Sequence, residues 1–157
     1  MMIRISLLLF ATLLVPSSGR SDVAKPSAEQ REVQKVLDGI RDACAKKDID
    51  RLEGLHAYGA RFSKFDDDAL GRQDAAIGKK GERDMFTAAR SIALRFDDVK
   101  IDVFGNAAVA TMLIWYDVDT GHEKLTGSDR ATLVLAREGG AWKIVHEHTS
   151  PFKPASH

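Results

Sequence analysis

The chain is 157 residues long, and its 23 Lys and Arg residues balance 23 Asp and Glu residues. A neutral chain with no basic run longer than Lys79-Lys80 is poorly suited to nucleic acid or to an anionic membrane surface, so we expect neither as a partner. The length suffices for one domain with one hydrophobic core.

The first segment has the pattern of a cleavable signal peptide. Arg4 gives a basic start, an apolar run follows from 5 to 15, and Pro16 to Gly19 supplies small, helix-breaking residues. The apolar run is shorter than the roughly 20 residues that a membrane-spanning helix needs. We therefore expect residues 1–21 to be removed on export to the periplasm or the medium, leaving no stable membrane anchor. Residues 22–27 are then a linker, and residues 28–153 are the domain.

Three helices are predicted after the linker. Ser27 begins a capping-box pattern, and apolar residues recur at helical spacing from about 28 to 47. Asp48 is suited to cap a second, shorter helix. A third amphipathic helix is predicted over 79–94, and the polar stretch 66–78 before it is expected to be a loop.

The periodicity then changes to that of strands. A short strand is predicted over 61–65, between the second and third helices, and longer ones over 99–103, 107–118, 126–137 and 142–150. Helices followed by consecutive antiparallel strands indicate an α+β domain with the helices packed on one face of the sheet.

This order of elements and the ending Trp142 to Ser150 (WKIVHEHTS) resemble the nuclear transport factor 2-like superfamily, and in particular its SnoaL-like domains. The same ending resembles the association domain of calcium/calmodulin-dependent protein kinase II, and Asp48-Ile49-Asp50 between the first two helices also fits. The resemblance spans residues 29 to 152. It implies a curved antiparallel β-sheet wrapped by N-terminal helices, a pocket between sheet and helices, and dimerisation through the sheet. It implies no single activity, because this fold hosts both enzymes and scaffolds.

Two histidines in the last strand are the first candidates for catalysis. Side chains two apart in a strand share a face, so Trp142, Ile144, His146 and His148 are predicted to point together into the pocket. An imidazole can act as a general base or hydrogen-bond donor near neutral pH. The alternative is that the rings satisfy buried backbone groups or contact solvent.

The same His-x-His pair could supply two metal ligands. A third would have to come from His56, Asp66 or His122, and the sequence places none of these nearby. We therefore expect no metal site. We also expect no cofactor, because the chain has no glycine-rich phosphate loop and no paired cysteines.

Ketosteroid isomerases, to which the resemblance extends, use a carboxylate base on the strand after the second helix. Laying this chain on that pattern puts Lys64 near the base position, with Ser63 and Asp66 as neighbours. This departure argues against steroid-type isomerisation. Asp66 stays a candidate acid or base, the alternative being a solvated loop residue.

Other residues are candidates for the pocket wall, each with a simpler alternative. Cys44 lies on an apolar helix face and suits packing better than reactivity. Trp115 precedes Tyr116 on a strand, so one of the two faces the pocket and the other the outer sheet face. Arg130 could hold an anion or form a surface ion pair. The predicted wall comprises Tyr58, Cys44, Trp142, Arg130 and Trp115.

Three functions remain open. The first is an exported small-ligand-binding domain that forms a homodimer through the sheet, because apolar residues on both faces of the strand at 109–118 require a cover on the outer face. The second is a cyclase, isomerase or dehydratase of the SnoaL-like type that uses a pocket histidine as general base. The third is an oligomeric assembly module.

Overall fold

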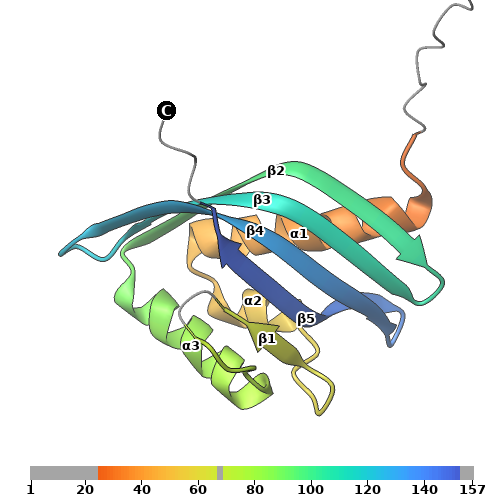
Figure 1. The fold of residues 1–157 in the computed structure, drawn as a ribbon, viewed down its shortest axis with the longest axis horizontal. Helices are drawn as coiled ribbons and strands as arrows, with labels where there is room; N and C mark the ends of the chain where they lie inside the picture. The colour runs from red at the N-terminus through yellow and green to blue at the C-terminus, as the bar shows by residue number, and fades with distance from the viewer. Residues whose placement is uncertain (1–24, 67–68, 153–157) are drawn as a thin grey trace, which may run out of the picture.

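The computed structural model describes residues 25–66 and 69–152, which form helices packed against a bent five-stranded sheet (Figure 1). The predicted signal peptide, residues 1–21, lies outside the described residues, as do residues 22–24 of the linker. Among the residues described, no helix has both the length and the apolar character needed to cross a membrane.

The first two helices begin at the predicted caps. In α1 (Ala28–Lys46), Ser27 Oγ accepts a hydrogen bond from the Gln30 backbone N–H at 3.2 Å, and Gln30 Oε1 accepts one from the Ser27 N–H at 2.8 Å. This is the complete capping box. Asp48 caps α2 (Ile49–Gly54) by accepting from the Arg51 N–H at 3.0 Å.

The third helix, α3 (Ala75–Ala88), is displaced from the prediction toward the N-terminus. Asp74 caps it by accepting from the backbone N–H groups of Ala76 and Ile77, so the expected loop is shorter than 66–78. Residues 91–94 belong to a strand instead. The prediction was wrong there because Ile92 and Leu94, two residues apart, fit the period of a strand that follows the helix directly.

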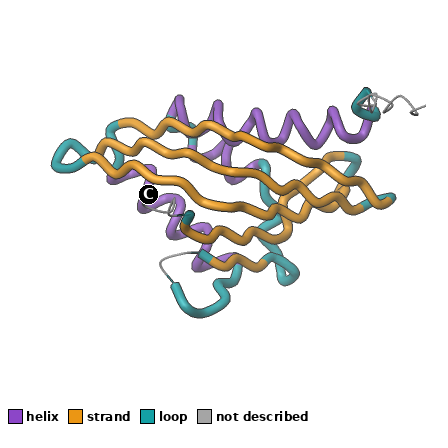
Figure 2. The backbone as a smooth tube through the Cα atoms, turned by 45° about the horizontal axis from the view of Figure 1, so that its top comes forward, coloured by secondary structure: helices purple, strands orange, loops and turns teal. Residues whose placement is uncertain are grey.

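The sheet has the order β1-β5-β4-β3-β2. All neighbours are antiparallel except β1, which pairs in parallel with β5. Figure 2 shows the strands side by side with the helices drawn behind them. Gly139 and Gly140, at φ 57° and 84°, make the two-residue turn between β4 and β5. The strands are β1 (Ser63–Phe65), β2 (Ser91–Phe104), β3 (Ala107–Asp119), β4 (Lys124–Glu138) and β5 (Ala141–Pro151).

Two irregularities interrupt the strand pairing. In β2 the register shifts between Asp97 and Lys100, where Asp98 has a φ of 50°. In β5, Ile144 pairs with Leu135 and His146 with Val134, so Val145 is an extra residue. Such bulges bend strands and re-aim the side chains beyond them.

The core lies between the helices and the inner face of the sheet. Val33 and Leu37 of α1 and Leu135 and Ile144 of the sheet are fully buried in one cluster. A second cluster joins the end of α1 to α2, α3 and the ends of β2 and β3. The predicted α+β class, a curved sheet wrapped by N-terminal helices, is confirmed.

Candidate functional site

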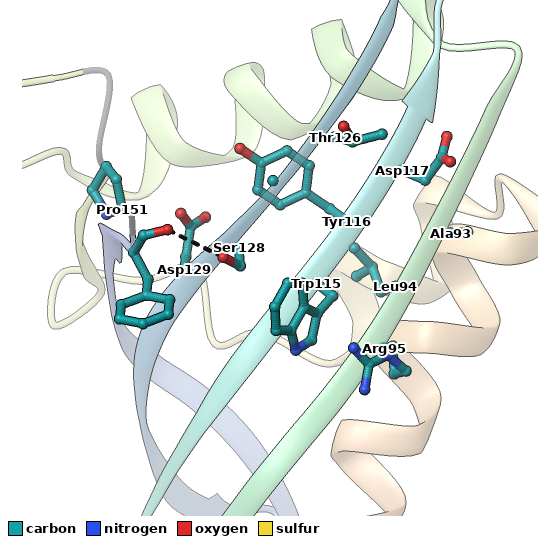
Figure 3. A pocket seen from close by; sticks show the side chains of 12 residues that line it. Ala93, Leu94, Arg95, Trp115, Tyr116, Asp117, Thr126, Ser128, Asp129 and Pro151 are labelled. Carbon is teal, nitrogen blue, oxygen red and sulfur yellow. Dashed lines mark hydrogen bonds between the residues drawn. The ribbon is translucent and has the colours of Figure 1, made fainter. Parts of the chain in front are cut away.

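The two largest hollows among the described residues lie on opposite faces of the sheet. The larger, about 710 Å³, is a groove on the outer face, where Trp115 and Arg95 lie (Figure 3). Phe152 also lines this groove. Arg95 stacks over the Trp115 ring with its Cζ 5.0 Å from the ring centre, and Arg130 stacks over Phe152 at the same distance. This groove is lined by apolar side chains together with the charged Arg95, Asp117 and Asp129, a combination that protein contact surfaces also have.

The second hollow is an inner cavity of about 530 Å³ between α3 and the sheet. Its wall is largely apolar, and Ile77, Met85 and Leu125 are exposed where they line it. Tyr116 also lines it, and the far end of its ring lies over Gly127, where a Cβ would be 2.3 Å from the hydroxyl. The polar groups of the wall include Lys64, Asp66, Glu82 and Asp129. We take this cavity as the candidate site, because buried titratable groups converge on it.

Lys64 is the centre of these buried charges. It points inward from β1, with Nζ 3.2 Å from Glu147 Oε2, 3.7 Å from Glu82 Oε1 and 3.1 Å from Asp66 Oδ2. These three carboxylates raise the pKa of Lys64 against the opposing effect of its burial. The ammonium is therefore permanently charged and held in place.

His56 is a second buried cation. Its Nδ1 lies 2.9 Å from the Leu52 carbonyl oxygen, and its Nε2 lies 2.9 Å from Glu147 Oε1. A carbonyl and a carboxylate can only accept, so both ring nitrogens carry protons and the ring is an imidazolium. Burial lowers the pKa of His56, but the Glu147 and Glu82 carboxylates outweigh it and hold the pKa above its usual value.

The two glutamates titrate in opposite directions. Burial tends to raise the pKa of Glu147, but Lys64 and His56 overcome that effect and hold it at about 2. The pKa of Glu82 is raised, by burial and by the nearby Glu147 charge, although the Tyr58 hydroxyl donates to its Oε2 at 2.5 Å. Glu82 lines the cavity, whereas Glu147 lies behind Lys64. Of the two glutamates, Glu82 is thus the one that takes up a proton more readily, and it is the one that faces the cavity.

Cys44 lines the cavity as predicted. Burial, assisted by the charges of Glu82 and Glu147, raises the pKa of its thiol to about 12. A thiol with such a pKa is protonated at neutral pH and is a packing group rather than a nucleophile.

Ligand atoms of His56, Glu82 and Glu147 lie within 4.8 Å of one another, a spacing that a metal ion could use. However, His56 Nε2 carries a proton, and the Lys64 ammonium lies between the two carboxylates. Two cations of the chain already neutralise this cluster, so its residues do not fit a divalent metal.

The shared face predicted for the last strand is wrong beyond Ile144. The extra residue Val145 shifts the alternation by one, so Glu147 points inward while His146 and His148 turn to the outer face. There His146 Nδ1 lies 2.9 Å from Ser63 Oγ, and both imidazoles make edge contacts with Phe65. Neither ring lines the inner cavity.

The remaining predicted residues divide between the cavity and other surroundings. Asp66 lines the cavity, where its Oδ1 accepts from the Thr149 hydroxyl at 3.1 Å. Tyr58 reaches the buried charges through Glu82. Three residues expected in the pocket wall lie elsewhere: Trp142 in the core with its Nε1 directed at Glu32, and Trp115 and Arg130 on the outer face.

The sequence interpretation missed Glu82 and Glu147 as site residues. A signal existed for Glu82, which occupies the buried stripe of α3 between Gly78 and Phe86 at intervals of four residues. A carboxylate on an apolar helix face needs a buried partner. For Glu147 there was no such signal, because its orientation depends on the bulge.

The comparisons agree with this architecture. The model of a family described as SnoaL-like domain matches residues 33–154. No curated protein matches the sequence.

Solved structures share the fold at low identity. A candidate dehydratase of the nuclear transport factor 2-like family from Streptomyces avermitilis is 18% identical with a TM-score of 0.71, covering 79% of this chain and 96% of that one. A nuclear transport factor 2-like superfamily protein from Salmonella enterica serovar Typhimurium is 20% identical with a TM-score of 0.69, covering 80% and 92%. A candidate calcium/calmodulin-dependent protein kinase II association domain from Xanthomonas campestris is 17% identical with a TM-score of 0.69, covering 82% and 91%.

Proposed function

Because this chain belongs to the SnoaL-like domain family, we propose that it binds a small molecule in the cavity between α3 and the sheet. The observation that carries this proposal is the cavity itself, about 530 Å³ with apolar walls and charged groups on one side. That volume falls in the range of small-molecule sites, roughly 300–1,000 Å³. The exposed apolar rim of Ile77, Met85 and Leu125 supports an apolar ligand body.

Gly81 offers a direct test. It lines the cavity, and a Cβ there would meet no atom within 4 Å. Gly81→Leu should therefore fill the mouth of the cavity without disturbing the core, whereas Gly81→Ala should leave most of the space. We expect 2-naphthylmethanol, a neutral apolar probe, to bind the wild type and Gly81→Ala, and to bind Gly81→Leu at least about tenfold more weakly in ligand-observed NMR. Equal binding to both variants would place the site elsewhere.

Acid–base catalysis is the second candidate function, and the raised pKa of Glu82 beside the Lys64 ammonium favours it. The carboxylate would move a proton while the ammonium stabilises a developing oxyanion. The measurement is deuterium exchange at the methyl group of 2-acetonaphthone in D₂O. Exchange at the buffer rate with wild-type protein would exclude this activity for aryl ketones of that size.

Export and a homodimer complete the proposal. Export rests on the basic and apolar segments before residue 16, and the N-terminal sequence of protein secreted from a bacterial host should begin near residues 20–22. Dimerisation rests on the outer groove, where Trp115 is 36% exposed beside Arg95 and Phe152. Similar folds include a candidate kinase association domain, but that likeness concerns the fold alone.

A further inference from the structure

The cavity has an excess of negative charge at its polar side. Asp66, Glu82 and Asp129 line it, and Glu147 lies directly behind Lys64. Among the described residues that line the cavity, Lys64 is the one cation, and His56 is the only other buried base in contact with the cluster. Two cations thus face four carboxylates.

Neither cation is available to an anionic ligand. The Lys64 ammonium has carboxylate oxygens of Asp66, Glu82 and Glu147 within 3.7 Å, and its side chain is 14% exposed. His56 uses both ring nitrogens internally, and its side chain is 1% exposed. A carboxylate or phosphate entering the cavity would meet like charges without a free donor to compensate for the loss of its hydration.

The pKa values of the two buried bases are shifted in the direction that the surrounding carboxylates require. Burial alone would lower the pKa of both Lys64 and His56, yet both are raised. The charges of Glu147 and Glu82, together with the hydrogen bonds that neighbours of the two bases accept, reverse the effect of burial. A ligand cation placed beside Glu82 would experience the same charges.

From the geometry and charge of the cavity, we propose that it selects small molecules that combine an apolar body with a protonated amino group. The amine would approach Glu82 and Asp129, and the apolar body would contact the wall of Ile77, Met85 and Leu94. Charge-assisted hydrogen bonds from ammonium to carboxylate supply the selectivity. This inference rests on the proposed function and adds the chemical class of the ligand.

A matched set of probes with one apolar body tests the inference. The probes are 2-naphthylmethylamine, 2-naphthylmethanol and 2-naphthoate, titrated into the full chain at pH 7 and followed by NMR of the protein amides. We expect the amine to bind at least about tenfold more tightly than the alcohol, and the naphthoate to bind most weakly. Asp129→Asn and Glu82→Gln should each reduce the preference for the amine by about threefold or more, since either change removes one carboxylate charge. Asp117→Asn, on the outer face of β3, is the control and should leave the preference unchanged.

The outcomes separate this inference from the proposed function. If the alcohol binds as tightly as the amine and Gly81→Leu blocks both, the cavity is a ligand site but the charge preference is wrong. Tighter binding of the naphthoate than of the amine would also overturn the inferred preference for an amino group. If no probe binds at millimolar concentration, the proposed function fails together with the inference. Should Glu82→Gln not fold, an unchanged preference in folded Asp129→Asn and Asp66→Asn would still refute it.

Discussion

Lys64 shows how one residue determines the chemistry of a cavity. At the strand position where the isomerase pattern has a carboxylate, this chain has an ammonium, and that ammonium permits Glu82 and Glu147 to be buried close to each other. Buried charges persist only when paired and hydrogen-bonded, and His56 and Tyr58 provide the remaining contacts. The carboxylates that pair with Lys64 therefore come from α3, from β5 and from the residue after β1.

The pKa of Glu147 leads to a prediction about acid stability. Its folded value of about 2 lies below the ordinary value of 4.5, so ionised Glu147 stabilises the fold above pH 4.5, and this contribution is lost as the pH falls from 4.5 toward 2. We expect Glu147→Gln to lower the free energy of unfolding at pH 7 by about 3 kcal/mol. Urea unfolding at several pH values measures both effects.

The pH dependence distinguishes this explanation from a simple packing defect. In Glu147→Gln the loss of stability between pH 4.5 and 2 should be smaller than in the wild type, because the titrating group is gone. Glu123→Gln, at an exposed turn position, is the control and should change neither the stability nor its pH dependence. If Glu147→Gln lost as much stability as the wild type between pH 4.5 and 2, the pH dependence could not be assigned to Glu147.

At the scale of elements, two glycines of α3 have different roles. A Cβ at Gly78 would lie 3.1 Å from Phe62 Cε1, so this glycine permits the close approach of α3 to the segment before β1. Gly81, one turn away, faces open space. Glycine inside a helix costs roughly 0.5–1 kcal/mol relative to alanine, but only at Gly81 does nothing oppose the substitution.

We therefore expect Gly81→Ala to stabilise the protein by about 0.5–1 kcal/mol, which raises the Tm by roughly 2–5 °C. Gly78→Ala should be less stable than Gly81→Ala, because the Phe62 ring must move. Differential scanning calorimetry of the two variants gives the comparison directly. If the two variants gained the same stability, the Phe62 ring would move away from the new methyl group at no cost in free energy.

The elements show what the sequence could and could not determine. Local signals located the helix starts at Ser27 and Asp48, because a cap is decided by residues within one turn. The bulge at Val145 could not be inferred from the period-two pattern, which assumes an unbroken strand. Part of the site was predicted, because Asp66 and Cys44 lie in its wall. The contact of His56 with Glu147 was not, because it joins residues 91 positions apart and leaves no local signal in the sequence.

At the scale of the whole molecule, the outer sheet face carries the proposed dimer contact. Trp115 lies in the outer groove with polar and charged neighbours around it, and a second copy would bury it. We expect sedimentation at micromolar concentration to give a dimer for the wild type and a monomer for Trp115→Glu, because a buried unpaired carboxylate would oppose association. Phe104→Glu, at an exposed aromatic outside the groove, is the control and should remain dimeric. A monomeric wild type refutes the dimer, and a larger ring would favour the assembly module.

The single additional residue in β5 has a consequence for how this cavity could diversify. Because Ile144 and His146 already occupy successive positions of the ladder, removing Val145 would keep Glu147 inward, whereas pairing Val145 in regular register would turn His146 and His148 inward and Glu147 outward. The presence of one bulge, without any substitution, therefore decides whether a carboxylate or two imidazoles of β5 face the interior. Proteins of this architecture can therefore differ in the chemistry of their interior through strand register alone.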